Sequence, residues 1–229
     1  MKVSVIVPAY NEELYIARAL TALLAQDYPD FEVIVVDNAS TDRTSAVAAN
    51  FPVKLLHEKQ KGTMWACERG RQAASGEVIV RMDADCVPED AEWLKKGVSY
   101  FKDLDVVGVS GVYFFYDHPS VMFRYAVFIG NKLIKIIHNL LIFLKLGACF
   151  IGGNTFMRAS TLAAIGGFNT SILFWGDDVD TGKRLSKCGK VIFDTALIIK
   201  SSGRRYQKEG ALRLSLKYVY YFFLVIFKF

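Results

Sequence analysis

Two aspartates separated by a single residue, Asp83 and Asp85, are the first side chains in the sequence that suit a chemical role. They follow an apolar run and are therefore expected at the end of a strand. Two carboxylates in that position suit a hard divalent cation that bridges to a diphosphate. Acidic turns of this kind also occur in solvated loops, so the pair alone leaves both interpretations open.

A second acidic group, residues 176–180, contains three aspartates at the predicted start of a helix. Acids at that position complement the helix dipole, which is an ordinary structural role. Phe174 and Trp175 precede the group and would shield it partly from water. Burial and repulsion between like charges both raise the pKa of a carboxyl group, as a general base requires.

The first 115 residues alternate apolar runs with helical patterns, which predicts the elements that position the first acidic group. The predicted strands are residues 3–7, 32–36, 53–57, 77–82 and 106–112, and the predicted helices are 12–26, 42–50, 62–74 and 91–101. This order predicts an α/β fold with a mostly parallel sheet and helices on both faces. Such sheets bind ligands at the carboxyl ends of their strands. Residues 8–12, 37–42 and 83–85 are therefore the candidate binding loops.

The second half of the chain has a different pattern. Residues 119–150 combine large apolar residues with bases and predict an amphipathic helical insertion. Further strands are predicted at 151–157, 190–193 and 196–200, and helices at 161–165 and 178–187. We therefore divide the chain into a domain of residues 1–200 and a basic loop with an aromatic helix at 201–229.

Composition limits the possible partners. The net charge of the 229 residues is +5, but residues 121–150 have four bases and no acid, and residues 200–229 have seven bases and one acid. An acidic body with two basic, aromatic-rich segments is unlike a nucleic-acid binder. The four cysteines form no C-x-x-C pair, which favours reduced thiols in the cytosol. The longest uncharged apolar run is residues 218–227, too short to span a membrane.

Five motifs in order resemble the family 2 glycosyltransferases with the GT-A fold. They are residues 5–13 (VIVPAYNEE), 35–42 (VVDNASTD), 83–85 (DAD), 152–154 (GGN) and 176–180 (GDDVD). The resemblance covers residues 1–200 and implies an inverting enzyme that uses a UDP- or GDP-sugar with Mn²⁺ or Mg²⁺. Direct displacement at the anomeric carbon would then release the nucleoside diphosphate.

The resemblance also implies a donor site. The residues expected beside the nucleotide are Pro8, Ala9, Tyr10, Glu12, Asp37, Lys61 and Gly62. Tyr10 offers a flat contact and Asp37 an acceptor for the base edge, whereas Asp42 is expected only to cap a helix. Asp85 is the stronger metal ligand, and Asp83 faces either the metal or the ribose. Arg204 and Arg205 are expected to neutralise the leaving diphosphate, with attraction to a membrane surface as their competing role.

The implied acceptor side centres on Asp178, which matches the second acid of the family's Glu-Asp pair and is our candidate general base. The residues expected to position the acceptor are Gly153, Asn154, Trp175 and Asp177. Trp175 would stack on a sugar, although a core tryptophan is nearly as consistent with the sequence. Asp177 replaces the usual glutamate with a shorter acid.

Two departures from the family pattern change the expectations. Many relatives supply a metal-binding histidine after the last strands, but this chain has SSGRRY at 201–206, and none of its three histidines is near that segment. The metal would then be held by Asp85, the diphosphate and water. The Gln-x-x-Arg-Trp signature of processive synthases is also absent from the sequence, which favours transfer of a single sugar.

The acceptor is inferred from residues 119–150 and 206–229. Their apolar and basic side chains favour a lipid-linked acceptor, such as a polyprenyl phosphate or lipid-linked saccharide, and a protein bound to the anionic cytoplasmic face of the cell membrane without crossing it. The main alternative is a soluble acceptor, with these segments forming a homodimer interface. A nucleotidyltransferase is disfavoured because the loop after the first strand lacks a basic, Gly-rich phosphate motif. A non-catalytic membrane-binding module is disfavoured by the complete set of Asp83, Asp85 and Asp178.

Overall fold

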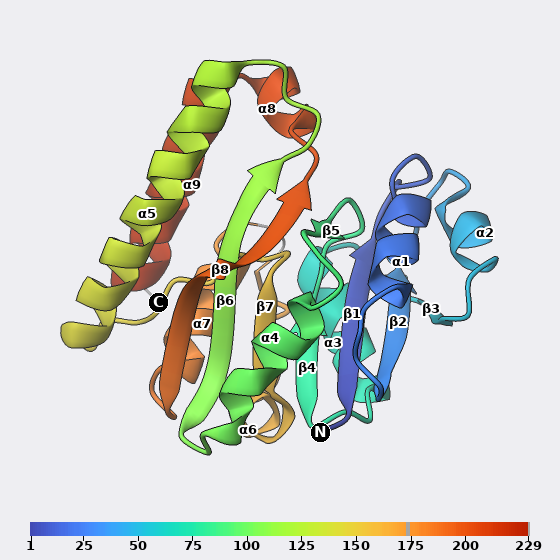
Figure 1. Cartoon of the computed structure of the whole chain (residues 1–229), viewed down its shortest axis with the longest axis horizontal. Coiled ribbons are helices and arrows are strands. Elements are labelled where there is room, and N and C mark those ends of the chain that lie inside the picture. Colours follow the sequence, from blue (N-terminus) through green and yellow to red (C-terminus); the bar gives the residue numbers. More distant parts are fainter. Residues whose placement is uncertain (173–174, 229) are drawn as a thin grey trace.

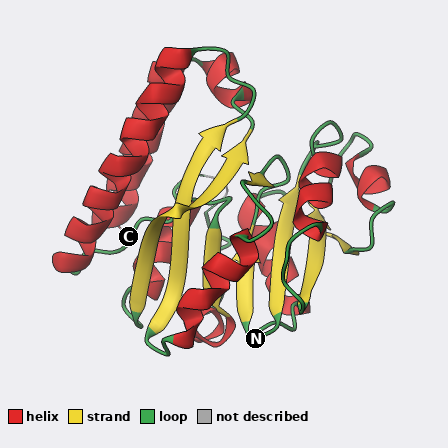
Figure 2. Cartoon of the chain, in the orientation of Figure 1, coloured by secondary structure: helices red, strands yellow, loops and turns green. Residues whose placement is uncertain are grey.

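The sheet is the organising element of the computed structural model, which describes residues 1–172 and 175–228 (Figure 1). Eight strands of these residues form it in the order β3-β2-β1-β4-β7-β6-β8-β5. The strands are β1 (Val3–Ala9), β2 (Phe31–Asp37), β3 (Lys54–His57), β4 (Val78–Arg81), β5 (Val87–Pro88), β6 (Val106–Phe115), β7 (Thr155–Arg158) and β8 (Lys190–Ser201). Figure 2 shows helices against the sheet, as the α/β prediction requires.

The N-terminal half of the sheet is parallel. β1 lies between β2 and β4, and β2 pairs with β3. All seven residues of β1 are buried, because its side chains alternate between two hydrophobic cores. Val3, Val5 and Val7 enter one core and Ile6 enters the other. The parallel direction brings the carboxyl ends of β1, β2 and β4, and hence the three candidate loops, to one edge.

Helices cover both faces of the sheet. The first core includes side chains of α1 (Ile16–Leu24), α2 (Thr44–Ala48), α4 (Trp93–Ser99) and the short 3₁₀ helix η1 (Tyr100–Lys102). The second core includes side chains of α3 (Thr63–Ala73), α6 (Ala159–Ala164) and α7 (Asp177–Leu185). Each group therefore packs on its own face, and the doubly covered arrangement expected from the sequence is confirmed.

The C-terminal half of the sheet differs in detail from the prediction. β7 is antiparallel to both neighbours and begins only at Thr155. Residues 190–201 form one strand where two were predicted, because β8 stays paired with β6 through a bulge: Gly111 pairs with Asp194 and Val112 with Ile198. A Cβ at Gly111 would overlap the Leu197 carbonyl oxygen, so only glycine fits there. β5, two residues long, was not predicted.

Two long helices, α5 (Val121–Phe143) and α9 (Ala211–Lys228), lie beside the extended ends of β6 and β8 (Figure 1). The short α8 (Arg204–Glu209) precedes α9. A third core, which includes Leu141 of α5, Val179 of α7 and Val225 of α9, attaches both helices to the sheet. α5 continues through Gly130 without interruption.

Much of the apolar surface of α5 and α9 faces outward. We call this the α5–α9 surface; its exposed members include Met122, Tyr125, Phe128, Leu133, Ile136, Leu140 and Phe143 of α5, and Leu212, Leu216, Tyr220, Phe223 and Phe227 of α9. Within the described residues, α5 is the one helix whose length and composition would allow it to cross a membrane, and 17% of its most apolar window is buried. The sequence predicts a helical insertion here but no membrane span, because Arg124, Lys132 and Lys135 interrupt the uncharged run, while the average over the helix remains apolar.

Candidate active site

The nucleotide side of the candidate site lies where β1 and β2 end. Ala9 pairs with Asp37 in the sheet, and Pro8 and Ala9 are buried, so both form the floor. Tyr10 is 46% exposed, and the Lys61 ammonium lies 5.6 Å from its ring centroid. The Gly62 N–H donates to Asn38 Oδ1 at 2.8 Å. The structure thus brings together residues predicted from three separate loops.

Asp37 has the geometry of an unused acceptor. The residue is buried, and its Oδ2 lies 3.4 Å from His57 Nδ1. Its Oδ1 is also buried but has no hydrogen-bond partner among the described residues. Because buried carboxylate oxygens are normally paired, this atom is available to a donor that arrives with a ligand. Asp42, in contrast, accepts from the N–H groups of Thr44 and Glu13. Its two oxygens are therefore used in the turn that precedes α2, whose N-cap is Arg43 and not Asp42 as predicted.

Asp85 lies at the centre of a group of charged side chains. Its Oδ1 accepts from Ser201 Oγ at 3.3 Å, and its Oδ2 lies 3.6 Å from Arg204 Nη2. Burial, with the charge of Asp83 as the next cause, raises the pKa of Asp85. Arg204 also forms an ion pair with Glu12 and packs over the Tyr15 ring, 4.2 Å from its centroid.

Glu12, which we expect beside the nucleobase or ribose, contacts another predicted donor-site residue. One of its oxygens pairs with Arg204, and its Oε2 is buried without a hydrogen-bond partner among the described residues. Burial raises the pKa of Glu12, and the nearby carboxylates of Asp85 and Asp83 contribute to the rise. Glu12 therefore belongs to the same acidic group as the two aspartates.

The expectation that no histidine lies near residues 201–206 was wrong. The loop after β6 carries His118 to Gly203, where an added Cβ would lie 3.1 Å from the His118 Cβ. His118 stacks on Phe123 with 3.8 Å between centroids, and the adjacent Asp117 accepts from the Gly203 N–H at 2.5 Å. Among the described residues, however, no group of three or more His, Cys, Asp or Glu is arranged to hold a metal ion.

A buried arginine that the sequence analysis missed connects the two acidic groups. Arg81, the last residue of β4, lies with its Nη1 2.5 Å from Asp177 Oδ2 and its Nη2 3.3 Å from Asp83 Oδ1. Its side chain is 8% exposed, and that of Asp177 is 10% exposed. A base inside the apolar run VIVRMDAD was the available signal, because a buried cation needs a carboxylate partner. Asp177 is thereby occupied by Arg81.

Asp178 lies in the first turn of α7, beside this pair. Its Oδ1 accepts from the Val179 N–H at 2.8 Å. Burial, followed by repulsion from Asp177, raises the pKa of Asp178 to about 7. A carboxyl group with such a pKa can accept a proton near neutrality, as a general base must. Phe174, predicted to shield the group, lies outside the described residues.

The loop at 152–154 is divided between two roles. A Cβ on Gly153 would lie 2.8 Å from Cys86 Sγ and 3.3 Å from Asp83 Oδ2, so Gly153 does border the site. Asn154 is fully buried, and the prediction that it contacts the acceptor conflicts with the structure. Its Oδ1 accepts from Trp93 Nε1, and its Nδ2 donates to the carbonyls of Val112 and Leu197, which uses all of its polar atoms structurally.

Trp175 connects the site to α9. Its ring stacks on Tyr221 at 5.5 Å and meets Tyr218 edge-on at 5.2 Å. The cationic groups of Arg205 and Lys217 lie 6.0 and 5.5 Å from its centroid. The half-buried ring is therefore neither a core residue nor isolated in solvent.

Comparison with known proteins identifies the family. The model for "Glycosyl transferase family 2" matches residues 4–166, most of the chain. The chain belongs to this family. Among curated relatives, the glycosyltransferase AglE of Haloferax volcanii is 30% identical over 82% of this chain and 62% of its own length. The dolichol-phosphate mannosyltransferase of Pyrococcus furiosus is 40% identical over 42% of this chain and 31% of its own.

Solved structures agree on the GT-A fold. The mannosyltransferase PcManGT of Pyrobaculum calidifontis, in complex with GDP-mannose and Mn²⁺, has a TM-score of 0.73 and 26% identity. The match covers 96% of this chain and 63% of that one. The glucosyl-3-phosphoglycerate synthase of Mycobacterium tuberculosis, with Mn²⁺ and UDP-glucose, has a TM-score of 0.65 at 19% identity and supports the fold alone. This chain thus spans 62% and 31% of the lengths of the two curated relatives named here.

The carboxylates of this family 2 protein fit a divalent metal. Asp83 and Asp85 are hard oxygen donors that follow one strand. Their charges help to raise the pKa of Glu12, but the three carboxylates are not arranged as a metal-binding group in the described residues, so Asp83 and Asp85 are the candidate ligands. Mn²⁺ or Mg²⁺ held by these side chains would keep further positions for oxygens of a diphosphate and water. The Arg204 guanidinium, which lies between Glu12 and Asp85, adds positive charge at the same place.

Proposed function

We propose that the protein is an inverting, non-processive glycosyltransferase that moves one sugar from a UDP- or GDP-sugar to a lipid-linked acceptor. The observation that carries this proposal is the location of Asp178. The raised pKa of Asp178 suits a general base. Arg81 forms ion pairs with both the adjacent Asp177 and Asp83 of the proposed metal site. Trp175, three residues before Asp178, stacks on Tyr221 of α9.

In the proposed reaction, Asp178 removes the proton from an acceptor hydroxyl as that oxygen attacks the anomeric carbon. The bond from this carbon to the diphosphate oxygen breaks on the opposite side, and its electron pair leaves with the nucleoside diphosphate. Asp85 and Asp83 would hold the divalent metal, which supplies positive charge to the leaving diphosphate. Arg204 and Arg205 add cationic groups for the same anion. For an acceptor that is already an ionised phosphate, Asp178 would only orient the nucleophile.

On the donor side, the unpaired Oδ1 of Asp37 would accept a hydrogen bond from the base edge, and the exposed Tyr10 ring would lie against the base. Lys61 and Gly62 would lie beside the phosphates, where glycine permits a close approach. Gly153 would line the acceptor side next to Asp83.

Two observations support a lipid-linked acceptor. The α5–α9 surface is apolar with interspersed bases, and α9 contacts the segment that holds Asp178. One curated relative is named dolichol-phosphate mannosyltransferase. We infer that the protein lies on the cytoplasmic face of the cell membrane, with bases toward anionic lipid. A soluble acceptor, with the same surface forming a homodimer, is the second candidate.

A product analysis tests the reaction class. The protein is incubated with individual UDP- and GDP-sugars and Mn²⁺, and the released nucleotide is identified. Slow hydrolysis or transfer that yields a nucleoside diphosphate supports the proposal, and release of pyrophosphate would identify a nucleotidyltransferase instead. Failure of every nucleotide sugar to be hydrolysed or to stabilise the protein would contradict the proposed function.

A further inference from the structure

A groove between α5 and α9 is not used by the site described above. Its volume is about 390 Å³, and its walls include Phe123, Gly130 and Ile134 of α5 and Leu212 and Ser215 of α9. Small residues keep it open: a Cβ added to Gly130 would meet no atom within 4 Å. The groove opens beside the exposed apolar side chains of the α5–α9 surface.

Tyr113 and Tyr206 line the groove, and aromatic rings connect it to the segment before α7. The Tyr206 ring lies 6.4 Å from that of Tyr218, which meets Trp175 edge-on at 5.2 Å. Asn131, 4% exposed, also lines the groove. Its Nδ2 donates to the Tyr113 carbonyl, while its Oδ1 is buried without a partner among the described residues. An unpaired buried acceptor beside open space indicates a site that receives a ligand or water.

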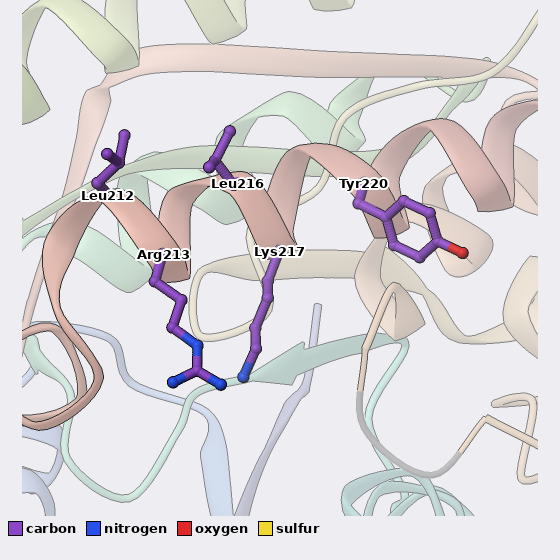
Figure 3. Close-up of a pocket in the computed structure, with 5 residues that line it drawn as sticks. All are labelled: Leu212, Arg213, Leu216, Lys217 and Tyr220. Atoms are coloured by element: carbon purple, nitrogen blue, oxygen red, sulfur yellow. The ribbon is translucent and has the colours of Figure 1, made fainter.

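Three bases, Arg205, Arg213 and Lys217, lie on α8 and α9 close to the groove residues Tyr206 and Leu212 in the chain. Leu212 borders both the groove and a second hollow on α9, where Arg213 and Lys217 extend from the same side of the helix (Figure 3). Lys217 and Arg205 both lie over the Trp175 ring. The carboxylate among them is Glu209, which pairs with Lys217 at 2.8 Å, and Lys217, Arg205 and Arg213 together lower its pKa. The bases outnumber the acid, so the cluster attracts an anion.

We propose that this groove binds the acceptor lipid itself: a hydrocarbon chain lies between α5 and α9, and the phosphate attached to it contacts Arg213 and Lys217. This inference rests on the proposed function, because it assumes that the acceptor is lipid-linked. The chemistry on each side matches such an amphiphile, since an apolar channel and a cationic cluster meet at Leu212. The bound phosphate would then lie beside Trp175, whose segment continues directly into Asp178.

The test measures equilibrium binding, without sugar transfer, to the full chain in detergent-free buffer. Geranyl phosphate below its critical micelle concentration is the probe, and geraniol and inorganic phosphate separate the contributions of chain and charge. We expect geranyl phosphate to bind at least about tenfold more tightly than either fragment, because only it uses both parts of the site. Equal affinity for inorganic phosphate would overturn the proposal in favour of a free-anion site.

Two variants probe the two halves of the site. Lys217→Gln should weaken geranyl phosphate roughly tenfold and leave geraniol unchanged, because it removes a charge-assisted contact. Gly130→Leu fills the groove from a position with open space, and it should weaken both chain-bearing ligands. Lys187→Gln, which removes an exposed base beyond α7, is the matched control and should change nothing. Circular dichroism checks that each variant is folded.

The outcomes separate this proposal from the proposed function. The lipid site would be refuted if both Lys217→Gln and Gly130→Leu left the affinity for geranyl phosphate unchanged, even where sugar transfer is observed. It would also be refuted if sedimentation showed a concentration-dependent dimer that prevents geranyl phosphate from binding. Groove binding with the expected pattern, together with transfer only to soluble acceptors, would retain the site and refute the proposed acceptor.

Discussion

Asp178 differs from the other acids of the chain in what surrounds it. Asp83 and Asp177 share the Arg81 guanidinium, and Asp85 lies near Arg204, while Asp178 is bonded only to backbone N–H groups among the described contacts. Short-range spacing predicted that these acids matter. It did not predict which base neutralises which acid, because Arg81 and Asp177 are 96 residues apart.

A first prediction concerns the metal. Asp85→Asn keeps the shape of the side chain and removes its charge, so Mn²⁺-dependent binding of the nucleotide should weaken by at least about tenfold. Calorimetry with and without Mn²⁺ measures this difference. Asp27→Asn, which changes a largely exposed acid, is the control and should bind like the wild type. Undiminished metal-dependent binding by the Asp85 variant would refute the assignment.

A second prediction follows from the pKa of Asp178. Because the folded-state value of about 7 lies above the ordinary 3.8, the carboxyl group is protonated and inactive as a base at acid pH. The rate of transfer to a hydroxyl acceptor should therefore rise through about pH 7.

The same pKa shift predicts how stability depends on pH. Asp178 lowers the free energy of unfolding as the pH rises from about 4 to 7, since its ionisation is disfavoured in the folded state. Asp178→Asn should thus raise the urea midpoint more at pH 8 than at pH 5.

At the scale of elements, the strands and helices that could be predicted are those with a pattern in their own residues. The buried β-branched runs of β1, β2 and β4 and the helices between them were confirmed within a few residues. The sequence predicted two strands where β8 is continuous. Residues 194–197 alone indicate the end of a strand, and the bulge that keeps β8 continuous depends on its pairing with β6. The apolar length of α5 was underestimated because its bases interrupt an otherwise apolar helix.

The bulge gives a prediction that compares two glycines. Gly111→Ala places a Cβ against the Leu197 carbonyl and should lower the free energy of unfolding by about 2 kcal/mol, in the range of overpacked sites. Gly130→Ala places its Cβ in open space within α5 and should instead stabilise the protein by roughly 0.5–1 kcal/mol through helix propensity. Urea denaturation measures both. A neutral Gly111→Ala variant would show that the strand pair can open at no cost.

For the whole molecule, the central feature is the packing of α5 and α9, which carry the exposed α5–α9 surface, against a sheet that helices cover on both faces. The sequence indicated its composition, since bases and aromatics concentrate in those two segments. It did not indicate that α9 would contact the loop before α7, where a Cβ on Gly176 would lie 2.6 Å from Val225. That contact depends on the folded chain, and it places the apolar helices beside the candidate base.

A membrane prediction follows at this scale. The protein should float with liposomes, with binding that increases with anionic lipid and falls with salt. Replacing the exposed Phe223 and Phe227 with serine should reduce the bound fraction. Leu104→Ser, at an even more exposed apolar site in the turn before β6, should not. Phe222 is left unchanged because it packs partly on the third core. No flotation, together with a salt-insensitive dimer, would favour the soluble acceptor.

The most direct test of the account is the Asp178→Asn variant, measured for turnover and for donor binding on the same preparation. A general base contributes about 10²–10⁴-fold to the rate and little to ground-state binding of the donor. We predict that transfer to a hydroxyl acceptor falls by at least about a hundredfold, while the Kd for the nucleotide sugar with Mn²⁺ stays within about twofold. Loss of donor affinity in parallel with turnover would contradict the account, because Asp178 would then belong to the donor site.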